Sequence, residues 1–249
     1  MADYINIAQL FFEAFGLEDI TSTEMKTAIT QWYGLYKLNA VDCNNGNSLG
    51  IPRVIVDGLE RPVFGEYQAT VDEDTPKGKA VAEALQAINK NRKYFFDQTM
   101  IGAEGFIKPS PVKGKFVYSF IPRPNFLAFA RDAEGNITSL GTSCTTVKQE
   151  GRKRAYYTLI EWRIVDDNGY LTVHSRLYRS EGDKYSTKPV PLNSIPEYAD
   201  FQEEITYPVP IGNLGLVHIK TPTANCIDDS RDGVSFYASA VPEILKLYR

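Results

Sequence analysis

A histidine, a cysteine and an aspartate near the end of this sequence are its residues best suited to nucleophilic chemistry. His218 stands eight residues before Cys226, and Asp228 follows the cysteine closely. An imidazole that takes the thiol proton turns a cysteine into a nucleophile. The other histidine, His174, has no metal-ligand partner at a useful spacing. Two interpretations stay open: a ligand-binding or enzymatic site near His218, Cys226 and Asp228, or side chains with structural roles.

Three aspartates in the segment CIDDSRDG, Asp228, Asp229 and Asp232, form the candidate metal site. A calcium loop of the EF-hand type that begins at Asp228 has the required Gly233 at its sixth position, but Ser239 in place of glutamate at its twelfth. Aspartate and serine also satisfy the free N–H groups at the start of a helix and favour its positive end. We therefore interpret these aspartates as helix-start residues, and a metal site is the alternative.

Basic side chains gather in KQEGRKR, where Lys148, Arg152, Lys153 and Arg154 are candidates for contact with DNA. The stretch INKNRK adds a second basic group. The alternative is that both are solvated, one at a hairpin tip and the other at a helix end. The net charge of −4 argues against a protein that grips nucleic acid through a strongly basic face.

Composition and motifs bound the class of protein. The chain has 249 residues, 43% hydrophobic and 23% charged, which suits one large or two small globular domains. The patterns GxGxxG, GxxxxGK[ST], GxSxG and HExxH are absent, so no motif here specifies an enzyme or a cofactor site. Three widely spaced cysteines, Cys43, Cys144 and Cys226, favour a reducing compartment. Without a signal peptide or a long apolar run, we expect a soluble protein made in the cytoplasm.

Helical periodicity predominates before residue 105. Thr21 and Glu24 have the spacing of a capping box, which predicts a helix start. The helical face that follows comprises Met25, Ile29, Trp32 and Tyr36. Residues 5–15 suggest a companion helix, and NNGNSLG (44–50) reads as a loop. Residues 54–56 fit a short strand or a helix start, while Asp-Thr-Pro at 74–76 predicts a helix whose face continues through Val81, Leu85 and Ile88.

Antiparallel strands are predicted after residue 105, followed by a closing helix. The β-branched and aromatic runs are separated by the hairpin-like sequences DAEGN, KQEGRK, DDNG and SEGDK. In YLTVHSRLYRS the alternation places Leu171, Val173 and Leu177 on one face and His174 on the other. Five prolines mark an irregular stretch, and residues 232–249 then predict an amphipathic helix, kinked at Pro242. The fold class is α+β: N-terminal helices, an antiparallel β-rich meander and a closing helix.

Several stretches in a fixed order resemble the portal protein of tailed bacteriophages, in particular that of siphophages and prophages of Gram-positive bacteria. They are FIPRPNFLAFARDAEGNITSLGTS, YYTLIEWRIVDDNGYLTVHSRLYRS, VPL and LGLVHIKTPTANCIDDSRDGVSFYASAVPEILKLYR. Earlier in the chain, ITQWYGLY and LGIPRVIVDGLERPVFGEY fit as well. The specificity lies in the succession IPR-x-NF, Glu-x7-Gly-Tyr-Leu, Leu-Tyr-Arg-Ser, Pro-Thr-Ala-Asn and Asp-Gly-Val-Ser. The resemblance covers nearly the whole chain.

The resemblance implies a structural subunit of a dodecameric ring at one capsid vertex. Such a ring docks the terminase packaging motor, conducts double-stranded DNA inward and outward, and joins the capsid to the head-tail connector. It implies no catalysis, cofactor, metal or membrane. The location implied is the portal vertex of the virion, with assembly in the host cytoplasm. The acidic net charge suits a conduit through which the duplex must slide.

The resemblance also implies how the chain divides. Residues 1–104 correspond to the mainly helical part of the portal wing, 105–231 to its β-rich part, and 232–249 to the start of a helix that leads toward the stem. The stem, clip and crown are not found in the chain, so we expect a truncated form that is monomeric or weakly associating. Tyr156, Trp162 and Tyr178 either supply ring contacts or belong to the core. A stand-alone assembly factor with the wing fold is a further interpretation.

Overall fold

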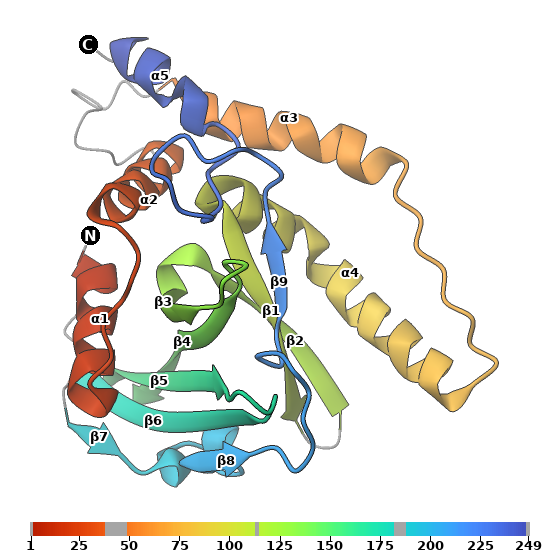
Figure 1. Ribbon diagram of the computed structural model, residues 1–249, viewed down its shortest axis with the longest axis vertical. Helices are drawn as coiled ribbons and strands as arrows, with labels where there is room; N and C mark the ends of the chain where they lie inside the picture. The colour runs from red at the N-terminus through yellow and green to blue at the C-terminus, as the bar shows by residue number, and fades with distance from the viewer. Residues whose placement is uncertain (1, 38–48, 113–114, 182–187, 248–249) are drawn as a thin grey trace. The chain divides into compact units, whose positions relative to one another are not determined.

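The computed structural model describes residues 2–37, 49–112, 115–181 and 188–247, and the side chains from residues 7 to 110 and 116 onward within those ranges (Figure 1). The described residues form two compact units, between which the chain passes more than once. We call Met1–Thr21 with Pro124–Leu216 the sheet unit, and Ser22–Arg123 with Val217–Arg249 the helical unit. The units thus interleave along the sequence and do not coincide with the segments 1–104, 105–231 and 232–249.

The sheet unit is built on one antiparallel sheet, the larger sheet. Within the described residues it has six strands, in the order β3-β4-β5-β6-β7, with β8 also paired to β6. The bounds are β3 (Phe126–Arg131), β4 (Ile137–Glu150), β5 (Lys153–Val165), β6 (Leu171–Glu181), β7 (Pro189–Val190) and β8 (Glu204–Thr206). The hairpin turns contain glycines with positive φ, Gly135, Gly151 and Gly169. The predicted meander is confirmed from β3 to β6, whereas KFVYSFI, the first run predicted for it, pairs in a separate sheet. Most of SEGDK lies outside the described residues.

Helix α1 (Ala2–Phe15) covers one face of the larger sheet. Phe11 lies 5.2 Å from Phe129 between ring centroids, and any side chain at Gly141 would clash with both rings. The opposite face packs against the 3-10 turns at 192–198, through Leu159 and Leu177 among others. The alternation predicted for β6 is therefore confirmed, and the face expected to be polar is covered by α1 rather than by water.

In the part of the chain that the structure describes, the helical unit combines a smaller sheet with four α-helices. Within the described residues its strand order is β2-β1-β9. The strands are β1 (Glu104–Val112), β2 (Lys115–Pro122) and β9 (Val217–Lys220), and the helices are α2 (Thr23–Tyr36), α3 (Ile51–Gly65), α4 (Pro76–Gly102) and α5 (Val241–Leu247). The α+β class with a closing C-terminal helix is thereby confirmed. No helix of the described ranges is long and apolar enough to cross a bilayer.

Two helix starts agree with the sequence and one differs. Thr75 caps α4 by accepting a hydrogen bond from the Gly78 N–H at 3.0 Å, as Asp-Thr-Pro predicts. Residues 54–56 belong to a helix, α3. The capping box expected at Thr21 is wrong, because Ser22 caps α2 by accepting from the Met25 N–H at 3.0 Å. The Thr21 hydroxyl instead donates to the Asp19 carboxylate.

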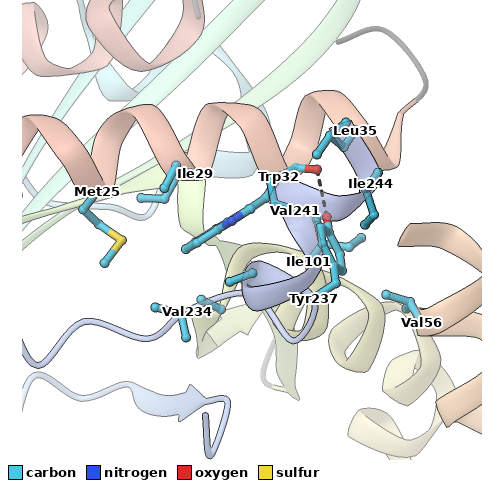
Figure 2. Close-up of a cluster of buried hydrophobic side chains, with 13 residues drawn as sticks. Met25, Ile29, Trp32, Leu35, Val56, Ile101, Val234, Tyr237, Val241 and Ile244 are labelled. Carbon is cyan, nitrogen blue, oxygen red and sulfur yellow. Dashed lines mark hydrogen bonds between the residues drawn. The ribbon is translucent and has the colours of Figure 1, made fainter. Parts of the chain in front are cut away.

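The predicted helical faces hold in α2 and weaken in α4. Met25, Ile29 and Trp32 are buried together in the main core of the helical unit (Figure 2). In α4, however, Val81 is 46% exposed, and the buried residues lie mainly in the C-terminal half of the helix. Residues 44–48 of the predicted loop, together with Cys43, lie outside the described residues.

The closing helix is shorter than predicted. Residues 232–237 are irregular, a 3-10 turn occupies Ala238–Ala240, and α5 begins at Val241. Pro242 therefore stands in the first turn, where a proline lacks no needed hydrogen bond, and the predicted kink is wrong. Asp232 and Ser235 do not start the helix: Ser235 donates to the Met100 carbonyl at 3.0 Å. Residues 248 and 249 of the predicted helix lie outside the described residues.

A tyrosine fixes the segment before α5 to α2. The Tyr237 hydroxyl donates to the Trp32 carbonyl at 2.8 Å inside the core, and Figure 2 shows the two residues joined. Tyr237 is 1% exposed, and burial raises the pKa of its hydroxyl well above the usual range, so it remains a neutral donor. One hydrogen bond thus ties the C-terminal segment to the first helix of this unit.

We expect Tyr237→Phe to lower the free energy of unfolding by about 1 to 2 kcal/mol, because the buried Trp32 carbonyl loses its donor. Urea unfolding followed by tryptophan fluorescence measures the change. Tyr67→Phe, at a tyrosine that is 40% exposed, is the matched control, with an expected change below about 0.5 kcal/mol. Equal effects of the two substitutions would contradict the assignment.

Candidate functional site

A polar cluster in the helical unit surrounds a buried arginine. Arg123 is 1% exposed, and its Nε lies 3.2 Å from Glu104 Oε1. Its Nη2 lies 3.5 Å from Asp232 Oδ2. His218 Nε2 lies 2.9 Å from the other oxygen of Glu104, and its ring stacks on Phe106 at 4.5 Å between centroids. We call Arg123, Glu104, Asp232 and His218 the ion network.

Each member of the ion network comes from a different segment. Glu104 opens β1 directly after α4, and Arg123 follows the last residue of β2. His218 lies in β9, where it pairs with Phe106 of β1 across the smaller sheet. Asp232 comes from the irregular segment before α5. The network therefore joins the end of α4, the smaller sheet and the C-terminal segment.

The backbone around the network is closely packed. Ala103, between α4 and β1, has a φ of +79°, which L side chains rarely adopt. Its carbonyl accepts from the Thr221 N–H at 2.8 Å, and a Cβ at Gly233 would stand 2.8 Å from the same oxygen. A Cβ at Gly102 would meet the Tyr33 hydroxyl at 2.4 Å. Gly102 and Gly233 thus permit approaches that any other residue would obstruct.

The members of the ion network differ in their exposure to solvent, and this difference determines their roles. Burying two carboxylates and a guanidinium costs several kcal/mol per ion, which pairing and hydrogen bonds must offset. Glu104 is 1% exposed and Asp232 is 3% exposed, whereas the His218 side chain is 36% exposed. The histidine is thus the member of the pair with Glu104 that meets solvent. The other three side chains act as an internal clamp.

Asp228 belongs to a different cluster, at the start of α2. Its carboxylate accepts from the hydroxyl of Ser22, the residue that caps α2, and from Ser230 Oγ at 2.6 Å and Asn225 Nδ2 at 2.8 Å. Partial burial raises the pKa of Asp228, but the hydrogen bonds from Ser22 and Ser230 outweigh it and leave the pKa below its usual range. Asp228 thus supports the cap of a helix that starts far away in the sequence.

The structure gives the sequence-predicted site residues separate surroundings. His218 pairs with Glu104, whereas Asp228 pairs with Ser22, Ser230 and Asn225. Cys226 is an exposed free thiol. Of the candidate metal ligands, Asp228 and Asp232 have different partners and Asp229 is exposed. Within the described ranges, no group of three or more acidic, histidine or cysteine side chains is placed to hold a metal ion.

The candidate DNA contacts lie around the β4–β5 turn, in the sheet unit. Lys148 forms an ion pair with Glu197, and Lys153 pairs with Glu181 at 3.2 Å. Arg152 and Arg154 are exposed. The prediction that this stretch is a hairpin tip is confirmed by the pairing of Glu150 with Lys153.

Of the three aromatic residues expected either in ring contacts or in the core, Tyr178 and Trp162 pack in the core of the sheet unit. Tyr178 is 4% exposed and belongs to the cluster under α1. Trp162 packs against the same cluster, stacks on His174 at 4.6 Å between centroids, and donates to Ser139 Oγ at 2.9 Å. Tyr156 is partly exposed. His174 is therefore an aromatic packing partner within the sheet unit.

An isolated carboxylate lies where α3 meets α4. Asp97 Oδ1 is buried and has no hydrogen-bond partner among the described residues. Partial burial raises the pKa of Asp97, and the carboxylates of Asp57 and Glu60 on α3 add to this while Lys93 opposes it. Lys93 itself pairs with Glu60 at 2.6 Å. The contact between these helices therefore contains a carboxyl group whose pKa lies above its usual range.

Sequence reasoning did not identify Arg123 and Glu104 as members of a site. A usable signal exists for Arg123, since FIPRPNF places it between apolar residues and prolines, where a charge is unusual. Glu104 carries no local signal, because a glutamate between a helix and a strand is ordinary. Their pairing depends on tertiary structure alone.

No protein-family model matches this sequence, and no curated protein is significantly similar to it. The role of the ion network therefore has to be inferred from the contacts and burial of its own residues.

We expect Arg123→Met to lower the free energy of unfolding of the helical unit by about 3 to 5 kcal/mol, because Glu104 and Asp232 then stay buried without their cation. Urea unfolding followed by Trp32 fluorescence measures it. Adding Glu104→Gln should recover part of the loss. Arg53→Met, at a guanidinium that is 65% exposed, is the matched control and should cost under about 0.5 kcal/mol. A loss below about 1 kcal/mol in Arg123→Met contradicts the clamp.

We expect Asp97→Asn to stabilise the protein at neutral pH. A raised pKa in the folded state means that the folded chain binds the proton more tightly, so this contribution is present at low pH and is lost as pH rises through the folded pKa. The urea midpoint of the variant should therefore exceed that of the wild type at pH 7, and the difference should vanish below about pH 4. Asp200→Asn, at an exposed aspartate, should show no such trend. A constant difference at all pH values would refute the assignment.

Proposed function

We propose that this chain is a structural subunit of the portal ring of a tailed bacteriophage. In this role it helps form the conduit for double-stranded DNA during packaging and ejection, and it joins the capsid to the tail at the portal vertex. Its partners are further copies of itself, the terminase motor, the capsid and the head-tail connector. It performs no catalysis, since the motor is a separate protein.

The observation that carries this proposal is the contact between two of the motifs on which the resemblance rests. Arg123 comes from Ile-Pro-Arg and Asp232 from Asp-Gly-Val-Ser, and their side chains form one buried ion pair. From the second motif, Ser235 also binds the end of α4 through the Met100 carbonyl. Asn225 of Pro-Thr-Ala-Asn organises the loop that supports the cap of α2, through Asp228. These motif residues thus hold the connections of the helical unit.

The motifs in the sheet unit also supply residues that hold the fold together. Glu161, which opens Glu-x7-Gly-Tyr-Leu, pairs with Arg163 at 3.2 Å, and Gly169 of the same motif provides the positive φ of the β5–β6 turn. In Leu-Tyr-Arg-Ser, Leu177 and Tyr178 are buried on opposite faces of the larger sheet. The residues that carry the resemblance are thus ones on which this fold depends, and this supports the proposal.

The alternative function is a ligand-binding or enzymatic domain with a site near His218, Cys226 and Asp228. It requires these side chains to converge on one bound molecule. The partners of His218 and Asp228 lie in different clusters, so the geometry favours the structural role. The stand-alone assembly factor differs from a portal subunit in forming no channel, and particle imaging distinguishes them.

The test is electron microscopy and mass measurement of the product of the complete gene, because the 249-residue chain by itself, as the wing alone, is expected to be monomeric or weakly associating. We expect closed rings of twelve copies with an axial channel at least as wide as a DNA duplex. Particles that remain monomeric in every salt condition, or that assemble without a channel, would overturn the proposal and favour the assembly factor. Retention of a small molecule or turnover of a substrate would favour the alternative.

A further inference from the structure

The larger sheet carries opposite charges at its two ends. At one end, the β4–β5 turn brings together Lys148, Arg152, Lys153 and Arg154, which we call the basic end. At the other end, two turns carry Asp132, Glu134, Asp166 and Asp167, which we call the acidic end. Strand β4 has 14 residues, so the ends lie roughly 40 Å apart at about 3.3 Å per residue.

The acidic end is a single surface because of the strand register. Ser139 of β4 pairs with Ile164 of β5, which places the β3–β4 turn beside the β5–β6 turn. Asp132 accepts hydrogen bonds from Asn136, whose side chain does most to hold the pKa of Asp132 below its usual range. In the described part of the chain, Asp167 makes no ion pair or side-chain hydrogen bond. The acidic end therefore carries fixed negative charge.

The basic end keeps cations that its own chain does not neutralise. Arg179 is engaged by Glu150 at 2.5 Å and by Glu181 at 3.1 Å. Lys153 shares Glu181, and its side chain is 76% exposed. Across the described residues, neither Arg152 nor Arg154 forms an ion pair or a side-chain hydrogen bond, and both are exposed. Two guanidinium groups at the tip of the β4–β5 hairpin are thus available for a carboxylate partner.

Each end also has an exposed apolar side chain beside its charges. Val147, one strand position from Lys148, is 53% exposed. At the acidic end, the N–H groups of Ile211 and Gly212 donate to the Gly169 carbonyl, which holds the segment with Val209 against the β5–β6 turn. Val209 is 59% exposed. An apolar contact bordered by opposite charges is the usual composition of a protein interface.

We propose that the basic end of one copy docks on the acidic end of a second copy, head to tail. The two ends belong to one continuous sheet and stand roughly 40 Å apart, so they cannot meet within a chain. Because every copy carries both ends, the acidic end of a second copy offers the charge that complements the basic end of the first. Contacts between two different patches on identical subunits propagate, and they close into a ring when the rotation between copies allows it. The inference rests on the proposed function and names the surfaces that join the ring.

Charge reversal with recombination tests this docking. The first variant is Arg152→Glu with Arg154→Glu, and the second is Glu134→Lys with Asp167→Lys. The third carries all four changes in one chain. Lys77→Glu with Lys79→Glu, in the exposed first turn of α4, matches the first variant in charge. Sedimentation velocity measures self-association in about 0.02 M and about 0.5 M salt, and circular dichroism confirms that each variant folds.

We expect wild-type self-association to weaken at high salt, and each two-residue variant to associate at least about tenfold more weakly than the wild type. An equimolar mixture of the first two variants should regain wild-type strength, because each then meets a complementary partner. The third variant should also associate, whereas the lysine control should behave as the wild type does.

A mixture no stronger than its separate components would overturn the docking, as would a wild-type chain that stays monomeric at low salt. Loss of binding to a DNA duplex in the first variant, with self-association unchanged, would assign the basic end to DNA instead. If the charge-reversed variants form twelvefold rings as readily as the wild type, this inference is refuted and the proposed function still stands. Recombined variants that form open chains would support the docking and refute the ring.

Discussion

A guanidinium buried between two carboxylates is the interaction on which the helical unit depends. Arg123 contacts Glu104 at the junction of α4 and β1 and Asp232 in the C-terminal segment, so one side chain joins parts of the chain far apart in sequence. The strained Ala103 and the close approach of Gly233 lie at the same junction. Losing one partner would leave a buried charge, which is far more costly than losing an exposed pair.

The sheet unit is stabilised by a simpler principle. Long antiparallel strands alternate buried residues between α1 on one face and the 3-10 turns on the other. Apart from buried pairs such as Glu161 with Arg163, two groups of its charged residues lie at the ends of the sheet, in turns that are exposed to solvent. This separation of apolar faces from charged ends is what gives the unit two distinct surfaces for association. A subunit that assembles by repetition requires two such surfaces.

Periodic elements were predictable from the sequence, and long-range contacts were not. The β6 alternation and the cap at Thr75 depend on neighbouring residues, so the pattern reveals them. Ser22 rather than Thr21 caps α2, and its hydroxyl binds Asp228, 206 residues away. Asp232 resembles a helix start in sequence, yet it pairs with Arg123 instead. For the same reason the sequence did not reveal that His218 and Asp228 have different partners, Glu104 and Ser22 respectively, because tertiary contacts between distant segments determine them.

The claim that Arg123 organises the helical unit can be tested most directly by the coupling energy between Arg123 and Asp232. A double-mutant cycle with Arg123→Met and Asp232→Asn, read by urea unfolding at Trp32, isolates their interaction from the effect of each change alone. A coupling of about 1.5 to 3 kcal/mol is predicted for a desolvated pair in one network. Additive losses, with a coupling below about 0.5 kcal/mol, would contradict the account.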